Sequence, residues 1–374
     1  MLGAVVLEMK RAYEAAGLLF KLHLDLLYQC DLDCAHCYLD DKQRRILPTA
    51  FWKDVLDQAG ELGVVSLLLS GGEIFLRKDL DELIRHARAR GLYVHLKSHG
   101  GFIDEAAADR LAALGVSSVA LSYYASDPAI HDAITRRPGS HEKTRRALGL
   151  LASRGIVTIA ACMVMRTNRD AWREVLAECN GLGVTVSIDG QLQRALSGDP
   201  FPQALGLDLE DAVALEHAML ARHGDDCDVG PPGRTIAPWE DKKNCGAGHS
   251  SLYVSPEGDV TPCVMWPEPL GNLAKGARLA DLWRGGPTLD RIRATRRVAR
   301  GTCARCEVRD DCDFCAGQAW IATGDANAAI ASFCLKTRAK TLARAAALGL
   351  PEPPMPAGLS APATLPRFVV RAAP

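Results

Sequence analysis

The stretch LHLDLLYQCDLDCAHC, residues 22–37, joins an apolar segment of strand length to three closely spaced cysteines. Residues 22–27 are predicted to form a β-strand, so Cys30, Cys34 and Cys37 emerge in the loop at its carboxyl end. In folds built on parallel strands, active sites lie at that end of the strands. The stretch therefore predicts a strand of a parallel sheet with a site for chemistry directly beside it.

The same strand begins a regular alternation of strands and helices. Apolar strand candidates occur at 22–27, 64–69, 92–97, 116–123, 156–164 and 184–188. Amphipathic stretches of helical length separate them, near 49–62, 80–90, 105–114, 141–154 and 170–182. A glycine follows each of these helices, as is common just past a helix end, at Gly63, Gly91, Gly115, Gly155 and Gly183. Repeated units of this kind predict a parallel α/β sheet, either open and doubly wound or partly closed into a barrel.

Length and composition indicate a folded protein without a dominant charge. The chain has 374 residues, of which 48% are hydrophobic, and 44 Lys and Arg residues stand against 45 Asp and Glu residues. A net charge of −1 argues against nucleic acid or an anionic membrane as the main partner. No apolar run approaches the roughly 18 residues that span a bilayer, and the first residues carry no export signal. We therefore expect a cytoplasmic protein, whose clustered cysteines more often bind metal or act in catalysis than form disulfides.

The organisation of the chain changes after residue 193, where the alternation stops and a stretch rich in Gly and Pro follows. Seven of the 13 cysteines lie between 245 and 334, in a region poor in apolar runs, which suits a domain held by metal. A helix at 337–348 and an extended surface tail at 351–366 are predicted after it. We expect an N-terminal extension (1–20), the strand and helix units (21–193), a linker with a bridging helix (194–239), a cysteine-rich domain (240–335), and a C-terminal helix with its proline-rich tail (336–374).

The three early cysteines have the spacing of a metal site. Thiolates at Cys30, Cys34 and Cys37 can wrap one cluster, but a 4Fe-4S cluster usually takes four protein ligands, so one iron would stay open. An open position can take a substrate, as it does in catalytic zinc sites. A zinc site near His36 and three unrelated thiols remain alternatives from spacing alone.

A second feature, Ser70-Gly71-Gly72-Glu73, follows the second predicted strand. Adjacent glycines let a backbone approach a ligand closely and leave its polar groups uncovered. Taken by itself, this pattern is more often a simple turn.

Together these residues resemble the radical S-adenosylmethionine (SAM) superfamily, whose signature of three cysteines is matched by Cys30, Cys34 and Cys37. The resemblance implies that the three thiolates hold a 4Fe-4S cluster whose remaining iron is chelated by S-adenosylmethionine. It implies that His36 helps to seat the adenine. It also implies a partial (β/α)6 barrel of the TIM type. This decides between the two arrangements considered above, an open, doubly wound sheet and a partly closed barrel.

The glycine pattern also matches the radical SAM superfamily. Gly71, Gly72 and Glu73 match the family's motif for the methionine amino group, with Ile74 where that motif commonly carries proline. Ser122, at the end of the fourth predicted strand, matches a position that contacts the ribose or the methionine moiety.

The stretch Ser98-His99-Gly100 follows the third predicted strand, where the family often shows a Ser/Thr-Asn-Gly turn. For this stretch and for Ser122, an ordinary turn residue or a helix-capping serine is the alternative.

The later cysteines form a further constellation. Cys245 and Cys263 precede a C-x2-C-x5-C-x2-C run, and a hairpin at 252–254 and 259–261 is predicted to carry Cys263. The remaining members are Cys303, Cys306, Cys312, Cys315 and Cys334. Paired C-x2-C units indicate metal, and a zinc ribbon would leave three thiols unused, so we favour iron-sulfur clusters.

This region resembles the SPASM extension of radical SAM enzymes, which binds two auxiliary 4Fe-4S clusters through seven cysteines. The resemblance assigns Cys245, Cys263 and Cys315 to the first auxiliary cluster. It assigns to the second Cys303, Cys306, Cys312 and Cys334. Cys227 is a candidate fourth ligand of the first cluster and is equally well explained as a free thiol.

Other notable residues have ordinary explanations. Cys162 and Cys179 are predicted to be small buried hydrophobes, with Cys162 a less favoured candidate for a hydrogen-atom donor. A basic run is predicted to be a solvated helix face, or else a dock for an acidic leader peptide or electron donor, and consists of Arg291, Arg293, Arg296, Arg297 and Arg300.

The resemblance implies an enzyme that reductively cleaves S-adenosylmethionine and abstracts hydrogen from a ribosomally synthesised peptide to install a crosslink or a related modification. The implied partners are a precursor peptide, a separate leader-binding protein, and an electron donor of the flavodoxin or ferredoxin type. A sulfatase-maturase-like activity and heme or redox-cofactor biosynthesis are alternatives within this chemistry. A non-catalytic iron-sulfur or zinc scaffold is the alternative from another class.

Overall fold

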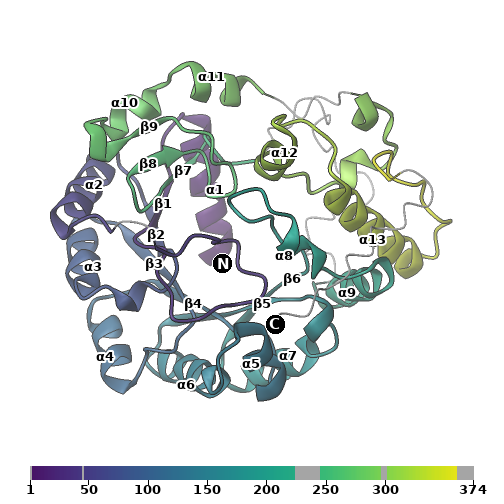
Figure 1. Cartoon of the computed structure of the whole chain (residues 1–374), viewed down its shortest axis with the longest axis horizontal. Helices are drawn as coiled ribbons and strands as arrows, with labels where there is room; N and C mark the ends of the chain where they lie inside the picture. The colour runs from purple at the N-terminus through teal and green to yellow at the C-terminus, as the bar shows by residue number, and fades with distance from the viewer. Residues whose placement is uncertain (1, 44–45, 224–244, 296–300, 360–374) are drawn as a thin grey trace.

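The computed structural model describes residues 2–43, 46–223, 245–295 and 301–359. One nine-stranded sheet runs through it in the order β6-β5-β4-β3-β2-β1-β7-β8-β9. In Figure 1 this sheet curves around the middle of the molecule, and helices line its outer side. Because β6 and β9 are the two end strands, the sheet is not a closed barrel among the described residues, and the expected partial barrel fits.

All the strands expected from the alternation are present, and each lies parallel to its neighbours. They are β1 (Lys21–Asp25), β2 (Ser66–Ser70), β3 (Tyr93–Ser98), β4 (Ser118–Ser122), β5 (Val157–Met163) and β6 (Thr185–Asp189). The predicted helices between them are also confirmed, as α2 (Thr49–Glu61), α3 (Leu80–Ala89), α4 (Glu105–Ala113), α6 (Ser140–Ser153) and α7 (Trp172–Gly181).

The sheet has an apolar outer face and a polar inner face, because alternate residues of a strand point to opposite sides. On β1, Leu22 and Leu24 are fully buried in the core beneath the helices, whereas His23 points the other way. On the same inner face, the His95 ring of β3 hydrogen bonds to the Ser118 hydroxyl of β4 at 2.7 Å. The main core therefore lies between sheet and helices, which leaves the inner face available for chemistry.

The predicted hairpin forms, as β7 (Ser251–Val254) and β8 (Asp259–Thr261), and β9 (Gly271–Asn272) follows it. β7 pairs in parallel with β1, so the hairpin extends the sheet of the barrel. The pairing buries Leu252 and Val254 in the main core, which gives this edge of β1 its partner. The first cysteines of the later region are thereby attached to the barrel.

Several helices lie outside the alternation that the sequence displays. α9 (Leu209–His223) is the bridging helix expected within 194–239. α13 (Ala331–Leu348) begins earlier than the predicted residue 337 and packs along α9. Others were not predicted, namely α1 (Leu2–Ala15), α5 (Pro128–Thr135), α8 (Phe201–Ala204), α10 (Leu279–Arg284), α11 (Pro287–Ala294) and α12 (Ala316–Thr323). None of the helices in the described ranges combines the length and the apolar character that a membrane crossing requires.

Candidate active site and cluster-binding cysteines

Cys30, Cys34 and Cys37 lie together in the loop that follows β1, as the sequence predicts. Burial raises the pKa of the Cys30 thiol to about 11. The pKa of Cys34 rises to about 12, because the thiol is buried and because the Cys37 and Cys30 thiols lie close to it. Three partly buried sulfurs in one loop suit a cationic cluster, which would hold them as thiolates.

His36 presents a buried nitrogen beside these cysteines. Its Nδ1 atom has no hydrogen-bond partner among the described residues. The ring packs edge-on against Tyr124 at 4.9 Å between centroids, and burial lowers its pKa to about 4, so the imidazole is neutral. A buried polar atom without a partner is costly, so this nitrogen is available to a ligand in the site.

Two glycines bring the loop after β2 into direct contact with the cluster loop. A Cβ atom added to Gly71 would lie 2.0 Å from the Leu27 carbonyl oxygen, and one added to Gly72 would lie 2.2 Å from that of Gln29. The Gly72 N–H donates to Leu27 O at 2.8 Å, and the Glu73 N–H donates to Gln29 O at 2.8 Å. Only glycine permits this approach, so the pair is a required feature of the site.

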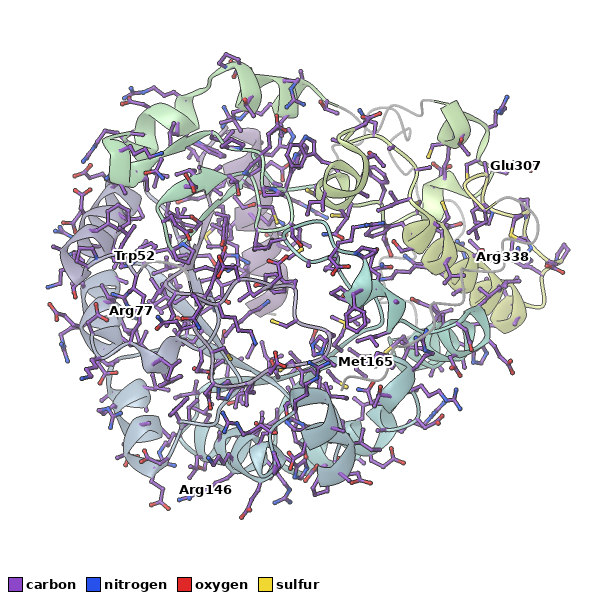
Figure 2. The ribbon with its side chains drawn as sticks, viewed as in Figure 1. Trp52, Arg77, Arg146, Met165, Glu307 and Arg338 are labelled. Atoms are coloured by element: carbon purple, nitrogen blue, oxygen red, sulfur yellow. The ribbon has the colours of Figure 1, made fainter. Side chains whose placement is uncertain are left out.

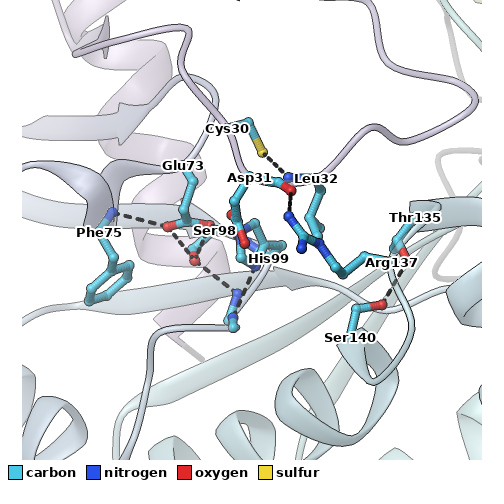
Figure 3. Close-up of polar contacts among 12 residues, drawn as sticks. Cys30, Asp31, Leu32, Glu73, Phe75, Ser98, His99, Thr135, Arg137 and Ser140 are labelled. Atoms are coloured by element: carbon cyan, nitrogen blue, oxygen red, sulfur yellow. Dashed lines mark hydrogen bonds and ion pairs between the residues drawn. The ribbon is translucent and has the colours of Figure 1, made fainter.

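The Glu73 carboxylate is fully buried and already occupied by protein donors. It accepts from the Phe75 N–H at 3.0 Å, from the Ser98 hydroxyl at 2.9 Å and from the His99 N–H at 3.0 Å. Figure 3 shows these bonds converging on the carboxylate. Glu73 therefore joins the ends of β2 and β3 and positions the glycine loop.

His99 connects this carboxylate to the cluster loop. Its Nδ1 atom accepts from the Gly101 N–H at 3.0 Å, so the neutral ring carries its proton on Nε2. The Nε2 atom lies 2.8 Å from an Asp31 carboxylate oxygen and 3.0 Å from Glu73 Oε2. Sulfur of Cys30, oxygen of Asp31 and nitrogen of His99 all lie within 4.8 Å of one another. The sequence singled out His99 as a turn residue and contained no signal for its contact with Asp31.

Ser122 lies at the end of β4 and close to the Tyr124 phenol. Burial raises the pKa of Tyr124, the nearby Cys34 and Cys37 thiols raise it further, and the Ser122 hydroxyl lowers it against the larger effect of burial. Ser122 is thus brought to the His36 side of the site through Tyr124. Tyr124 was missed by sequence reasoning, because nothing local distinguishes it from a core aromatic residue.

A buried chain of hydroxyl and carboxylate groups joins the cluster loop to β7. The Tyr28 and Tyr253 hydroxyls lie 2.6 Å apart, and Tyr253 donates to Asp25 at 2.9 Å. His23 lies 3.0 Å from the other Asp25 oxygen. Asp25 is fully buried, so these partners supply the hydrogen bonds that its charge requires. The contact spans chain positions too distant for sequence patterns to predict.

The later cysteines gather in two sets. The pKa of Cys263 rises to about 11 through burial and through the neighbouring Cys245 and Cys315 thiols. These are the three residues that the resemblance assigns to the first auxiliary cluster. The candidate fourth ligand, Cys227, lies outside the described residues.

Cys334 belongs to the second set. Its pKa rises to about 12 through burial and through the Cys312, Cys303 and Cys306 thiols. The pKa of Cys303 is likewise raised by burial and by its Cys312 and Cys306 neighbours. The seven thiols thus divide in space as the resemblance implies, and ligation by them stays a prediction.

Cys162 and Cys179 are buried as predicted. Both belong to the main core, with at most 1% of either residue exposed. Burial raises the pKa of Cys162, and the nearby Cys179 thiol raises it further. Cys179 lies on α7, so the Cys162 thiol is on the helix side of β5. This placement removes Cys162 from the inner face and argues against its minor interpretation as a hydrogen-atom donor.

The basic run is engaged within the protein where the structure describes it. Arg291 forms an ion pair with Glu268. Arg293 stacks on Trp283 at 4.4 Å and donates to Gly248 O at 2.9 Å. These two side chains therefore connect α11 to other segments of the cysteine-rich region. The other members lie outside the described residues, at Arg296, Arg297 and Arg300.

Comparison with family models yields two matches. The model of the radical SAM superfamily matches residues 26–179, and that of the SPASM iron-sulfur cluster-binding domain matches residues 245–307. The PqqA peptide cyclase of Xanthomonas oryzae pv. oryzae is 31% identical over 346 residues, which cover 87% of this chain and 90% of that protein. The PqqA peptide cyclase of Granulibacter bethesdensis is 27% identical over 321 residues, or 80% and 83% of the two chains.

Solved structures share the fold. Streptococcus suis SuiB bound to the precursor peptide SuiA superposes with a TM-score of 0.68 at 16% identity, covering 87% of this chain and 79% of that one. anSMEcpe with bound AdoMet and the Cp18Cys peptide has a TM-score of 0.67 at 16% identity, covering 88% and 98%. At these identities the likeness establishes the fold alone.

Proposed function

The chain belongs to the radical S-adenosylmethionine superfamily and carries a SPASM domain, and from that membership we propose that it modifies a ribosomally synthesised precursor peptide. The observation that carries the proposal is the 31% identity to a PqqA peptide cyclase across 87% of the chain. The modification is a crosslink or a related change. Membership of the superfamily makes the chain an enzyme, which excludes the non-catalytic scaffold.

Residues of the first site would hold the cofactors. Cys30, Cys34 and Cys37 would bind the 4Fe-4S cluster, and the unpartnered His36 nitrogen would receive the adenine of S-adenosylmethionine. The backbone of the glycine loop would face the methionine amino group. The chemistry that the bound cluster and S-adenosylmethionine supply is abstraction of a hydrogen atom from the substrate.

The chain itself must keep stray hydrogen donors away from a carbon radical. The Cys162 thiol lies on the helix side of β5. The Tyr28 hydroxyl is bonded to that of Tyr253, which in turn donates to Asp25. These arrangements support an inner face on which the substrate is the reactive donor.

The SPASM region would supply electron acceptors for the substrate radical. We assign the first auxiliary cluster to Cys245, Cys263 and Cys315 and the second to Cys303, Cys306, Cys312 and Cys334. A separate leader-binding protein and a donor of the flavodoxin or ferredoxin type complete the proposal.

Reconstitution under anaerobic conditions tests the first site without knowledge of the substrate. The reconstituted protein, reduced in the presence of S-adenosylmethionine, should release 5′-deoxyadenosine. A variant with alanine at Cys30, Cys34 and Cys37 should release none. Release from that variant would contradict the site assignment.

Co-expression with candidate precursor peptides tests the substrate class. Loss of two hydrogens from the peptide mass would indicate a crosslink, and an unchanged mass with deuterium uptake would indicate epimerisation. The same peptides expressed with the triple cysteine variant are the control. Peptides left unmodified by an enzyme that releases 5′-deoxyadenosine would contradict the proposed substrate class while leaving the site intact.

A further inference from the structure

The segment 351–359, after α13, folds back over Cys334. Cys334 lies in the first turn of α13 and is 9% exposed. Burial raises the pKa of the Cys334 thiol, and the Gly358 N–H lies close enough to the sulfur to lower it against that larger effect. A Cβ atom added at Gly358 would lie 2.4 Å from that sulfur, so only glycine allows the backbone to come this close. The segment therefore covers a thiol of the second set.

Arg338, one turn further along α13, anchors this segment. Its side chain is almost fully buried, and Figure 2 labels it beside α13. The guanidinium group donates to the Pro353 and Pro354 carbonyl oxygens and forms an ion pair with Glu352. A buried cation needs such partners, and these three fix the start of the segment to the helix that carries Cys334.

The sequence predicts an extended surface tail here, and the structure adds the contacts that hold its described part against α13. The rest of the tail, from residue 360 onward, lies outside the described residues. Its prolines restrict the unfolded chain, so ordering the segment costs less entropy than ordering a flexible tail. A stiff segment held by the buried Arg338 side chain can therefore stay in place over Cys334.

The same helix also contacts the segment around Cys312. Lys340 pairs with Asp313 at 3.0 Å, and Arg344 pairs with Asp311 at 3.1 Å. These contacts attach the turn that carries Cys312 to α13. One helix thus supplies Cys334, holds the Cys312 turn and anchors the covering segment.

We propose that residues 351–359 form a strap over the second auxiliary cluster, in which Gly358 donates a backbone hydrogen bond to the Cys334 sulfur and Arg338 acts as the positioning residue. The inference rests on the assignment of Cys334 to that cluster under the proposed function. Hydrogen bonds to cluster sulfurs and exclusion of solvent both control the properties of an iron-sulfur cluster. The strap supplies both from a part of the chain that carries none of the ligands.

Two truncations separate the strap from the rest of the tail. Ending the chain after Leu350 removes the strap, whereas ending it after Leu359 keeps it and serves as the matched control. After anaerobic reconstitution, a chelator should remove iron from the second auxiliary cluster several-fold faster in the shorter protein only. Release of 5′-deoxyadenosine should be the same in both, because the first site is untouched.

Point variants test the anchor and the hydrogen bond. R338M should speed iron release, R338K should restore part of the protection, and E352Q should stay close to wild type because both carbonyl contacts remain. G358A leaves the anchor in place but puts a methyl group against the sulfur, so it should also speed release. In the reduced wild-type cluster, electron-nuclear double resonance should detect an exchangeable proton that G358A and the shorter truncation lose.

The outcomes distinguish the strap from the site beneath it. A shorter truncation that keeps a full second cluster, the wild-type release rate and the exchangeable proton overturns the strap alone. A full-length protein that binds no cluster through Cys334 overturns the assignment and the strap with it.

Discussion

His99 occupies a position where the family's turn often has asparagine, and its longer side chain reaches further than an amide would. The ring accepts from the Gly101 N–H and directs its Nε2 proton toward Asp31, next to Cys30. The backbone of the same residue donates to Glu73. One residue thus couples the glycine loop to the cluster loop, through a main-chain donor to Glu73 and a ring nitrogen that lies close to both Asp31 and Glu73.

H99A should weaken binding of S-adenosylmethionine by roughly ten- to hundred-fold, because a hydrogen bond to a charged group contributes about 1.5–3 kcal/mol. H99N should fall between H99A and wild type. Affinity is measured from the change that S-adenosylmethionine causes in the spectrum of the reduced first cluster. H86A, which removes a similar imidazole–aspartate pair with Asp57 far from the loop, is the control. Wild-type affinity in H99A would contradict the coupling.

Gly72 is a second residue whose identity is dictated by a neighbour. In G72A the new methyl group would meet the Gln29 carbonyl at 2.2 Å, and a backbone oxygen cannot rotate away. We expect G72A to lower both the melting temperature and the iron content of the first site. G149A adds a methyl group to α6 with nothing within 4 Å and should stabilise the protein by about 0.5–1 kcal/mol. Equal melting temperatures and iron contents in the two variants would argue against the close approach.

At the scale of elements, β7 is the strand that unites the two halves of the sequence. It pairs with β1 along the backbone and sends Tyr253 to Asp25 and Tyr28. Y253F should lower the free energy of unfolding by about 1–3 kcal/mol, because the buried Asp25 carboxylate loses a donor. Y28F leaves the Tyr253 bond to Asp25 in place and should cost less. Denaturant unfolding of the two variants measures the difference. A greater loss of unfolding free energy in Y28F than in Y253F would show that the bond from Tyr253 to the Asp25 carboxylate is not the main contribution.

At the scale of the whole molecule, the sequence predicts local features well and long-range contacts poorly. Periodicity predicts β1 to β6 and the helices between them, because both depend on neighbouring residues. The thiols could be assigned to two sets only through the resemblance. Pairing of β7 with β1, the His99 contact with Asp31 and the strap over Cys334 depend on contacts between distant positions, which no local pattern encodes.

The spatial separation of the thiol sets leads to a prediction about the complete enzyme. The Cys306 thiol lies with Cys334 at α13, whereas the first site is built on β1 to β4. C306A should therefore lose the second auxiliary cluster and the modification of a peptide substrate, while release of 5′-deoxyadenosine continues. C179A, which removes a core thiol from neither set, should retain both iron content and modification. The contrary result is that C306A abolishes 5′-deoxyadenosine release while the first cluster is fully loaded. That result would show that cleavage of S-adenosylmethionine also needs the second auxiliary cluster, and it would contradict the assignment of cleavage to the barrel alone.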